Sequence, residues 1–144
     1  MQEKIANLML KEHGRLNSFL VDFNRLLEKD LLLAEKALDK FKWNLEKHFF
    51  LEEKVIFDIS SSIANEEVSE IFDLMKQHGE IMAELKDIEK NLQNRIKPKS
   101  EKLFSLIKEH ADYEDSVFYP KLDEKLTENQ KNYVVERVKE IIVA

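Results

Sequence analysis

Apolar residues recur at spacings of three and four along most of the chain, a pattern that fits one face of an α-helix and not a β-strand. The pattern predicts long helices over about residues 2–29, 31–59, 65–95 and 98–120, and a short one over 127–142. Only two glycines and two prolines interrupt the 144 residues, so few turns separate the helices. Short connections make neighbouring helices antiparallel. The sequence therefore predicts an all-α fold, an antiparallel up-down-up-down four-helix bundle with a short C-terminal fifth helix.

Capping and breaking residues set the expected helix ends. Asn65 is expected to cap the third long helix, and Thr127 with Gln130 three residues later predicts a capping box for the short one. The serines at 60–62 are expected to end the second helix. Pro120 is expected to end the fourth, because a proline ring clashes with the preceding helical turn.

Length and charge limit the class of protein. A chain of 144 residues predicts a single domain, 1–144, with a real core. The net charge of −6 leaves no basic surplus for phosphates, so we expect no nucleic-acid partner. The longest purely apolar run, 31–34, is far too short to span a membrane, and charged residues near the N-terminus do not fit a signal peptide. We expect a soluble cytoplasmic protein with no membrane partner; its oligomeric state stays open.

The chain contains four histidines, one in each predicted long helix and on or beside its apolar stripe. In an antiparallel bundle with a rise of about 1.5 Å per residue, their four rings come within about one helical turn of the same level. Two helices also carry a glutamate four residues after the histidine, on the same face. There is no cysteine, so any metal must be held by histidine and carboxylate. The expected inward set is His13, His48, Glu52, His78, His110 and Glu114.

The chain is also internally repeated. Residues 11–16 match 76–81, and residues 48–57 match 110–119, so each half supplies two histidines and one glutamate. Gly14 and Gly79 each follow a motif histidine in mid-helix, where glycine costs about 1 kcal/mol relative to alanine. We interpret them as room for a close neighbouring helix, although plain packing would also explain them.

Inward side chains of helical bundles are known to hold two metal ions, and imidazole with carboxylate suits iron or manganese. Two histidines for each metal and two bridging glutamates would leave each ion short of six ligands. The open positions are where a small molecule would bind.

The pattern of lone His13, His48-x-x-x-Glu52, lone His78 and His110-x-x-x-Glu114 resembles the hemerythrin-like, or HHE cation-binding, domain. The resemblance covers about residues 9–122 and includes the ends 53–57 and 115–120, which are similar to the family's Glu-x-x-Leu-Phe-Pro ending. It implies that Glu52 and Glu114 bridge two irons, with an oxo or hydroxo bridge and with manganese as an alternative metal. It also implies that His13 and His48 bind one ion and His78 and His110 the other.

One departure separates the chain from the oxygen-carrying hemerythrins, which have a fifth histidine near the third-helix ligand and an aspartate as second bridge. Leu74 and Met82 stand at the candidate positions for that histidine. The pattern is closer to members with four histidines and two glutamates, among them iron- or oxygen-responsive modules and proteins linked to iron–sulfur repair. Tyr113, three residues after His110, is a candidate to donate a hydrogen bond to bound oxygen or nitric oxide, with core packing as the alternative.

The leading hypothesis is a di-iron protein that binds O2, NO or a peroxide, in sensing, binding or stress protection. One alternative is an enzyme that reduces peroxide or NO, or that donates iron in iron–sulfur repair. Iron handling or storage is another, and a metal-free structural bundle is the last. Whether the protein is an enzyme stays open.

Overall fold

The computed structural model describes residues 3–62 and 66–143, and within these ranges every element is a helix or a helical turn. The all-α prediction is confirmed for this part of the chain. In chain order the elements are α1 (Ile5–Leu27), α2 (Leu31–Leu51), the π-helical turn η1 (Glu52–Ile56), α3 (Phe57–Ser61), α4 (Glu66–Gln93), α5 (Glu101–Tyr113), the π-helical turn η2 (Glu114–Phe118), α6 (Tyr119–Lys125), α7 (Glu128–Val138) and the π-helical turn η3 (Lys139–Val143).

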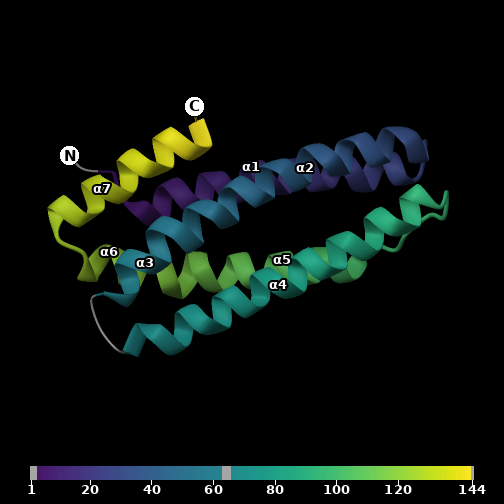
Figure 1. Cartoon of the computed structure of the whole chain (residues 1–144). Coiled ribbons are helices and arrows are strands. Elements are labelled where there is room, and N and C mark those ends of the chain that lie inside the picture. The colour runs from purple at the N-terminus through teal and green to yellow at the C-terminus, as the bar shows by residue number, and fades with distance from the viewer. Residues whose placement is uncertain (1–2, 63–65, 144) are drawn as a thin grey trace.

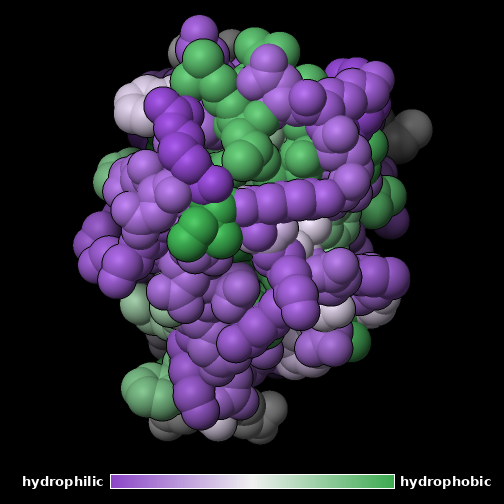
Figure 2. All heavy atoms as spheres, turned by 90° about the vertical axis from the view of Figure 1, so that its right-hand side faces the viewer, coloured by the Kyte–Doolittle hydropathy of each residue, from purple (hydrophilic) through white to green (hydrophobic). Residues whose placement is uncertain are grey.

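The long helices form a bundle of two layers. Figure 1 shows α1 beside α2 in one layer and α4 beside α5 in the other, with α7 lying across the end where α1 begins. The connections 28–30 and 94–100 lie together at the opposite end, which Figure 2 views face on. Hydrophilic residues cover most of that end, with hydrophobic ones visible between them. No helix in the described ranges is long and apolar enough to cross a membrane.

The core divides into two apolar clusters. One lies at the α7 end and includes Ile5, Leu51 and the fully buried Leu74, whereas the other lies toward the opposite end and includes Phe23 and Leu85. Burying such side chains contributes roughly 1.5–3 kcal/mol each, so both clusters stabilise the bundle. The sequence segments that carry the four histidines lie between them.

Each of the two histidine–glutamate helices changes from α to π winding at its glutamate. The π turn η1 begins at Glu52, whose carbonyl accepts the N–H of Phe57, and η2 begins at Glu114, whose carbonyl accepts the N–H of Tyr119. A π turn inserts an extra residue into the helix and is often found at functional sites. The apolar spacing of three and four did not predict these turns, because it assumes α geometry throughout.

The expectation that Pro120 ends a helix was wrong. The helical path continues through α6 to Lys125, with Pro120 among the first residues of α6, directly after η2. The π turn has already interrupted the regular hydrogen-bond ladder there, so the missing N–H of proline costs little. The continuation has a structural use, because the buried Asp123 of α6 accepts the N–H groups of Ile5 and Ala6 at 2.9 Å each and caps α1.

Other local expectations had mixed outcomes. The capping box is confirmed, since the Thr127 side chain accepts the Gln130 N–H and the Gln130 side chain accepts the Thr127 N–H. The second helical stretch ends at Ser61, as the serine cluster predicted. The Asn65 cap lies outside the described residues. The interpretation of Gly14 and Gly79 as close helix contacts was wrong, because a Cβ added at either would meet nothing within 4 Å.

The turn directly after α4 contains the one strained backbone position in the described residues. Arg95 has a φ of 60°, and the N–H groups of Arg95 and Ile96 close the helix onto the carbonyls of Leu92 and Asn91. Glycine favours this left-handed position, which costs other residues about 1–2 kcal/mol.

Arg95→Gly should therefore raise the free energy of unfolding by about 1 kcal/mol in urea titrations. Arg95→Ala, which keeps a Cβ, should give no such gain, and an equal gain would contradict the strain.

Candidate metal centre

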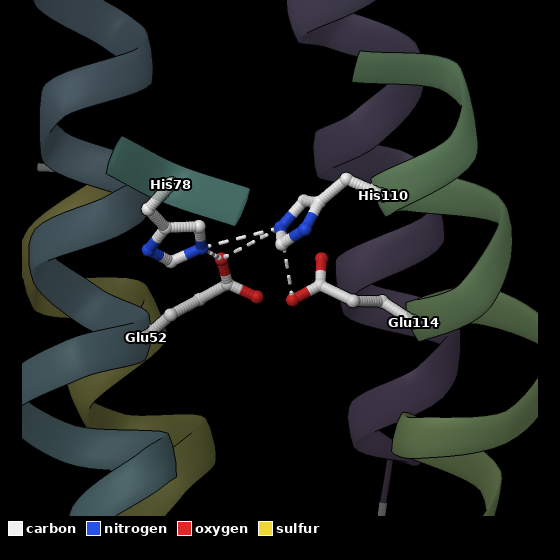
Figure 3. Close-up of side chains that lie close together, drawn as sticks. All are labelled: Glu52, His78, His110 and Glu114. Atoms are coloured by element: carbon white, nitrogen blue, oxygen red, sulfur yellow. Dashed lines mark hydrogen bonds and ion pairs between the residues drawn. The ribbon is translucent and has the colours of Figure 1, made fainter. Parts of the chain in front are cut away.

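The structure brings all six predicted side chains together in the middle of the bundle. The rings of His13 and His48 lie 5.0 Å apart between centroids, and those of His78 and His110 lie 4.8 Å apart. All except His13 are at most 4% exposed, and the His13 side chain is 10% exposed. Figure 3 shows His78, His110, Glu52 and Glu114 pointing toward one another, with His110 and Glu114 on one helical ribbon and His78 and Glu52 on two others.

Glu52 lies against three of the four rings. Its Oε1 is 3.0 Å from His78 Nε2, 3.3 Å from His48 Nε2 and 3.8 Å from His110 Nε2. Its Oε2 accepts a hydrogen bond from the hydroxyl of the fully buried Tyr119. One carboxylate oxygen of Glu52 therefore faces the histidines, while the other is held by tyrosine.

Glu114 faces the cluster with both oxygens. Its Oε1 is 3.2 Å from His13 Nε2 and its Oε2 is 3.4 Å from His110 Nε2, yet neither oxygen has a hydrogen-bond partner. His13 Nε2 and His48 Nδ1 are also buried without a hydrogen-bond partner. Buried polar atoms without partners cost free energy, and those of Glu114 and His13 face one another across the cluster.

A layer of polar side chains holds the outer nitrogens of three of the rings. His13 Nδ1 lies 2.9 Å from Asp115 Oδ1, and His78 Nδ1 lies 2.9 Å from Glu53 Oε2. These two carboxylates immediately follow Glu114 and Glu52, so the internal repeat extends to them. His110 Nδ1 lies 2.6 Å from Gln77 Oε1. Acceptors at Nδ1 favour the tautomer in which a proton is on Nδ1 and Nε2 is free to coordinate a metal.

The inward nitrogen and oxygen atoms form two overlapping groups with metal-ligand chemistry. One contains Glu52, His78, His110 and Glu114, and the other contains His13, His48 and Glu114, with the ligand atoms of each group within 4.8 Å of one another. A cation bound here would contact the atoms that have no hydrogen-bond partner, which include both oxygens of Glu114 and Nε2 of His13. The residues present therefore fit a bound metal.

Tyr119 is a site residue that sequence analysis missed. It follows Glu114 by five residues, a spacing that an α-helix turns away from the ligand face but a π turn brings back toward it. The internal repeat places Phe57 at the equivalent position, so only one half has this hydroxyl. The repeat gave one signal, because it aligns Tyr119 with Phe57 in the other histidine–glutamate segment. α-Helical spacing, however, directs the Tyr119 side chain away from the ligand face.

The other three candidate pocket residues are Tyr113, Leu74 and Met82, and the structure shows the surroundings of each. The hydroxyl of Tyr113 donates to Glu70, and the residue is 36% exposed. Leu74 is buried in the apolar cluster at the α7 end, and Met82 packs against the second apolar cluster. Leu74 and Met82 have apolar side chains, so they pack beside the centre's helices without offering it a polar group.

The cluster strongly shifts the pKa values of its members in the metal-free protein. Burial lowers the pKa of His13, but the hydrogen bond to Asp115, the close contact with Glu114 and the charges of Glu114 and Glu52 outweigh burial and raise it to about 10. Burial likewise opposes the charge of His110, and Glu114 and Glu52 raise its pKa to about 10. Burial would raise the pKa of Glu52, yet the His48 charge and hydrogen bonds lower it well below its usual range.

Comparison with known proteins supports the same chemistry. The family model described as the hemerythrin HHE cation binding domain matches residues 4–122. The match spans most of the chain and contains all six central residues. Neither the comparison with curated proteins nor that with solved structures found a match.

These pKa shifts predict how the stability of the metal-free protein depends on pH. The raised values of His13 and His110 stabilise the fold fully below their ordinary value of 6.5, and this contribution is lost as the pH rises toward 10. The lowered pKa of Glu52 acts oppositely, because its contribution is present above 4.5 and is lost as the pH falls. The free energy of unfolding, measured in urea, should decrease between pH 6.5 and 10.

Metal should change this pH dependence, because coordination needs neutral histidines and ionised glutamates. The metal-loaded protein should keep its stability as the pH rises and should lose metal and stability together on acidification. Identical melting temperatures with and without chelator at every pH would contradict the coupling.

Proposed function

We propose a function from one premise: the chain belongs to the hemerythrin HHE cation-binding family. The proposed function is the binding of two iron ions in the centre of the bundle and, at them, of O2, NO or a peroxide, in sensing, binding or stress protection. One domain, 1–144, with its long helices in up-down-up-down order would carry the centre. Manganese is the alternative metal.

The observation that carries the proposal is the convergence of six buried ligand side chains, several of whose atoms have no hydrogen-bond partner. Leaving such groups unpaired in a core costs roughly 1–3 kcal/mol each, and a cation would offset this cost. The two overlapping ligand groups support two ions that share Glu114, since one of its oxygens faces His13 and the other faces His110.

Nitrogen and carboxylate oxygen ligands without sulfur suit iron, which supplies reversible binding and redox chemistry toward oxygen and nitric oxide. The protein's part is to hold the ligands and exclude water. Asp115, Glu53 and Gln77 orient three of the rings, and Tyr119 fixes one oxygen of Glu52. Apolar side chains on both sides of the cluster keep the site dry.

Elemental analysis with optical spectra tests the proposal. We expect about two irons per chain, as the two ligand groups imply. The spectrum of the reduced protein should change on exposure to O2, NO or peroxide. A reversible change with O2 would support binding or sensing, whereas irreversible oxidation with turnover of peroxide or NO would favour the enzyme alternative. Absence of metal after reconstitution under argon would refute the proposal.

His48→Ala tests the ligand assignment. His48 contributes Nε2 to the cluster and is 1% exposed, so its removal should lower the iron content as well as the stability. Phe41→Ala is the matched control, because it removes a fully buried ring of the same helix that lies in the second apolar cluster and has no ligand atom. A His48→Ala protein that retains the iron content of the original protein would remove His48 from the ligands.

Asp115→Asn and Glu53→Gln test the outer carboxylates. Each substitution keeps an oxygen that can accept from the histidine Nδ1 but removes the charge, so the metal affinity should fall by about 10–100-fold. Asp58→Asn, at an exposed position of α3, is the control and should leave the affinity unchanged. Competition with a chelator of known affinity measures the effect. Unchanged affinity in both variants would contradict a role for these carboxylates at the centre.

A further inference from the structure

We propose that a neutral diatomic gas, O2 or NO, reaches the centre through a passage between α1 and α5 whose mouth is kept open by Gly14. This inference rests on the proposed function, since it concerns the ligand that the metal centre would take. The ligand would enter from the side of α1 and α5 and would be selected by its small size and lack of charge.

The outer part of the passage is a cavity of about 450 Å³ between α1 and α5. Leu10 and Gly14 line it from α1, and Phe104 and Ala111 line it from α5. Its inner limit includes His13 together with Asp115, the carboxylate that holds the outer nitrogen of that ring. An open space on the surface therefore extends to a candidate metal ligand.

The inner part is a small cavity of about 30 Å³ beside the centre. Three of the four rings line it, those of His13, His48 and His110, while apolar side chains that include Phe49 and Ile81 form other parts of its wall. A site needs about 10–15 Å³ to hold one water molecule, so this one suits a ligand of two heavy atoms and excludes a bulky organic peroxide.

The two cavities share three lining residues. His13, Ile107 and Ala111 line both the outer and the inner space, so the two spaces adjoin at these side chains. The alanine methyl is small, and side chains change rotamer within picoseconds to nanoseconds when they are not tightly held. A diatomic molecule would need only a small displacement of Ile107 to pass.

The charges along the passage favour a neutral ligand. At the rim, Lys108 and Asp112 pair with each other at 2.6 Å, so neither offers a free charge to attract an ion. Past the rim, the walls are largely apolar, and the one cationic group there, His13, is already paired with the Asp115 carboxylate, so an anion would lose its hydration and meet a like charge. O2 and NO do not carry this cost.

The two glycines of the chain supply a matched pair for the test. Gly14 and Gly79 occupy equivalent positions of the repeat, each after a motif histidine, and a Cβ at either would meet nothing within 4 Å. Gly14 lines the outer cavity, whereas Gly79 lines neither cavity. A leucine at 14 would extend into the passage, while a leucine at 79 would have the same effect on helix propensity without blocking it.

The experiment compares Gly14→Leu and Gly79→Leu in the iron-loaded, reduced protein by stopped-flow mixing with O2 and, separately, with NO. We expect Gly14→Leu to slow association with both gases by about tenfold or more, and Gly79→Leu to leave it unchanged. Iron content and melting temperature should not fall in either variant. Ala111→Leu, which narrows the junction from α5, should slow association as Gly14→Leu does.

Xenon provides a readout that does not depend on reaction at the metal. Crystals of the iron-loaded protein under xenon pressure should show a xenon atom between α1 and α5 in the original protein and in Gly79→Leu, and none there in Gly14→Leu. Equal association rates in both leucine variants, or xenon only elsewhere, would overturn the passage while leaving the proposed function intact. Failure of the original protein to bind iron or either gas would instead refute the proposed function.

Discussion

The buried meeting of four imidazoles and two carboxylates is the constraint on which the rest of the structure depends. Polar side chains with at most 10% exposure cannot be placed in the middle of an apolar core unless other groups pair with them. A surrounding layer of polar side chains provides this pairing, and each of its members contacts a central side chain: Asp115, Glu53, Gln77 and Tyr119. The two apolar clusters then pack on either side, so the polar layer divides the core instead of lying at its edge.

The internal repeat explains much of this layer and also shows where it is asymmetric. Asp115 and Glu53 occupy equivalent positions and hold equivalent rings, so the two halves agree there. Gln77 holds His110, but its equivalent, the buried Glu12, pairs with Arg15 at 2.8 Å instead, and His48 Nδ1 has no hydrogen-bond partner. Tyr119 holds Glu52, and its equivalent Phe57 has no hydroxyl to do the same for Glu114. The ligand group formed by His13, His48 and Glu114 is therefore the less constrained of the two groups.

Sequence reasoning predicted the parts that depend on α-helical spacing and missed those that depart from it. One histidine on each long helix, with a glutamate four residues after two of them, was enough to predict which six side chains meet. The π turns at Glu52 and Glu114 were not predictable in this way. α-Helical spacing gave no reason to expect Tyr119 at Glu52, where the widened turn brings it. The proline ring was expected to end the helix at Pro120, where the chain continues to Asp123. The contacts of Gln77 and Glu12 needed the folded structure, because their sequence positions are alike.

The less constrained ligand group also lies beside the inner cavity, which His13 and His48 line. The inner cavity is lined by His13, His48 and His110 but not by His78, whose ring stacks on Phe49 at 3.7 Å between centroids and is covered by it. A metal held by fewer oriented ligands and facing a cavity has room to accept an additional ligand, whereas one enclosed by oriented ligands and a stacked ring has less. The same asymmetry of the repeat therefore indicates which of the two ions would take up a small molecule.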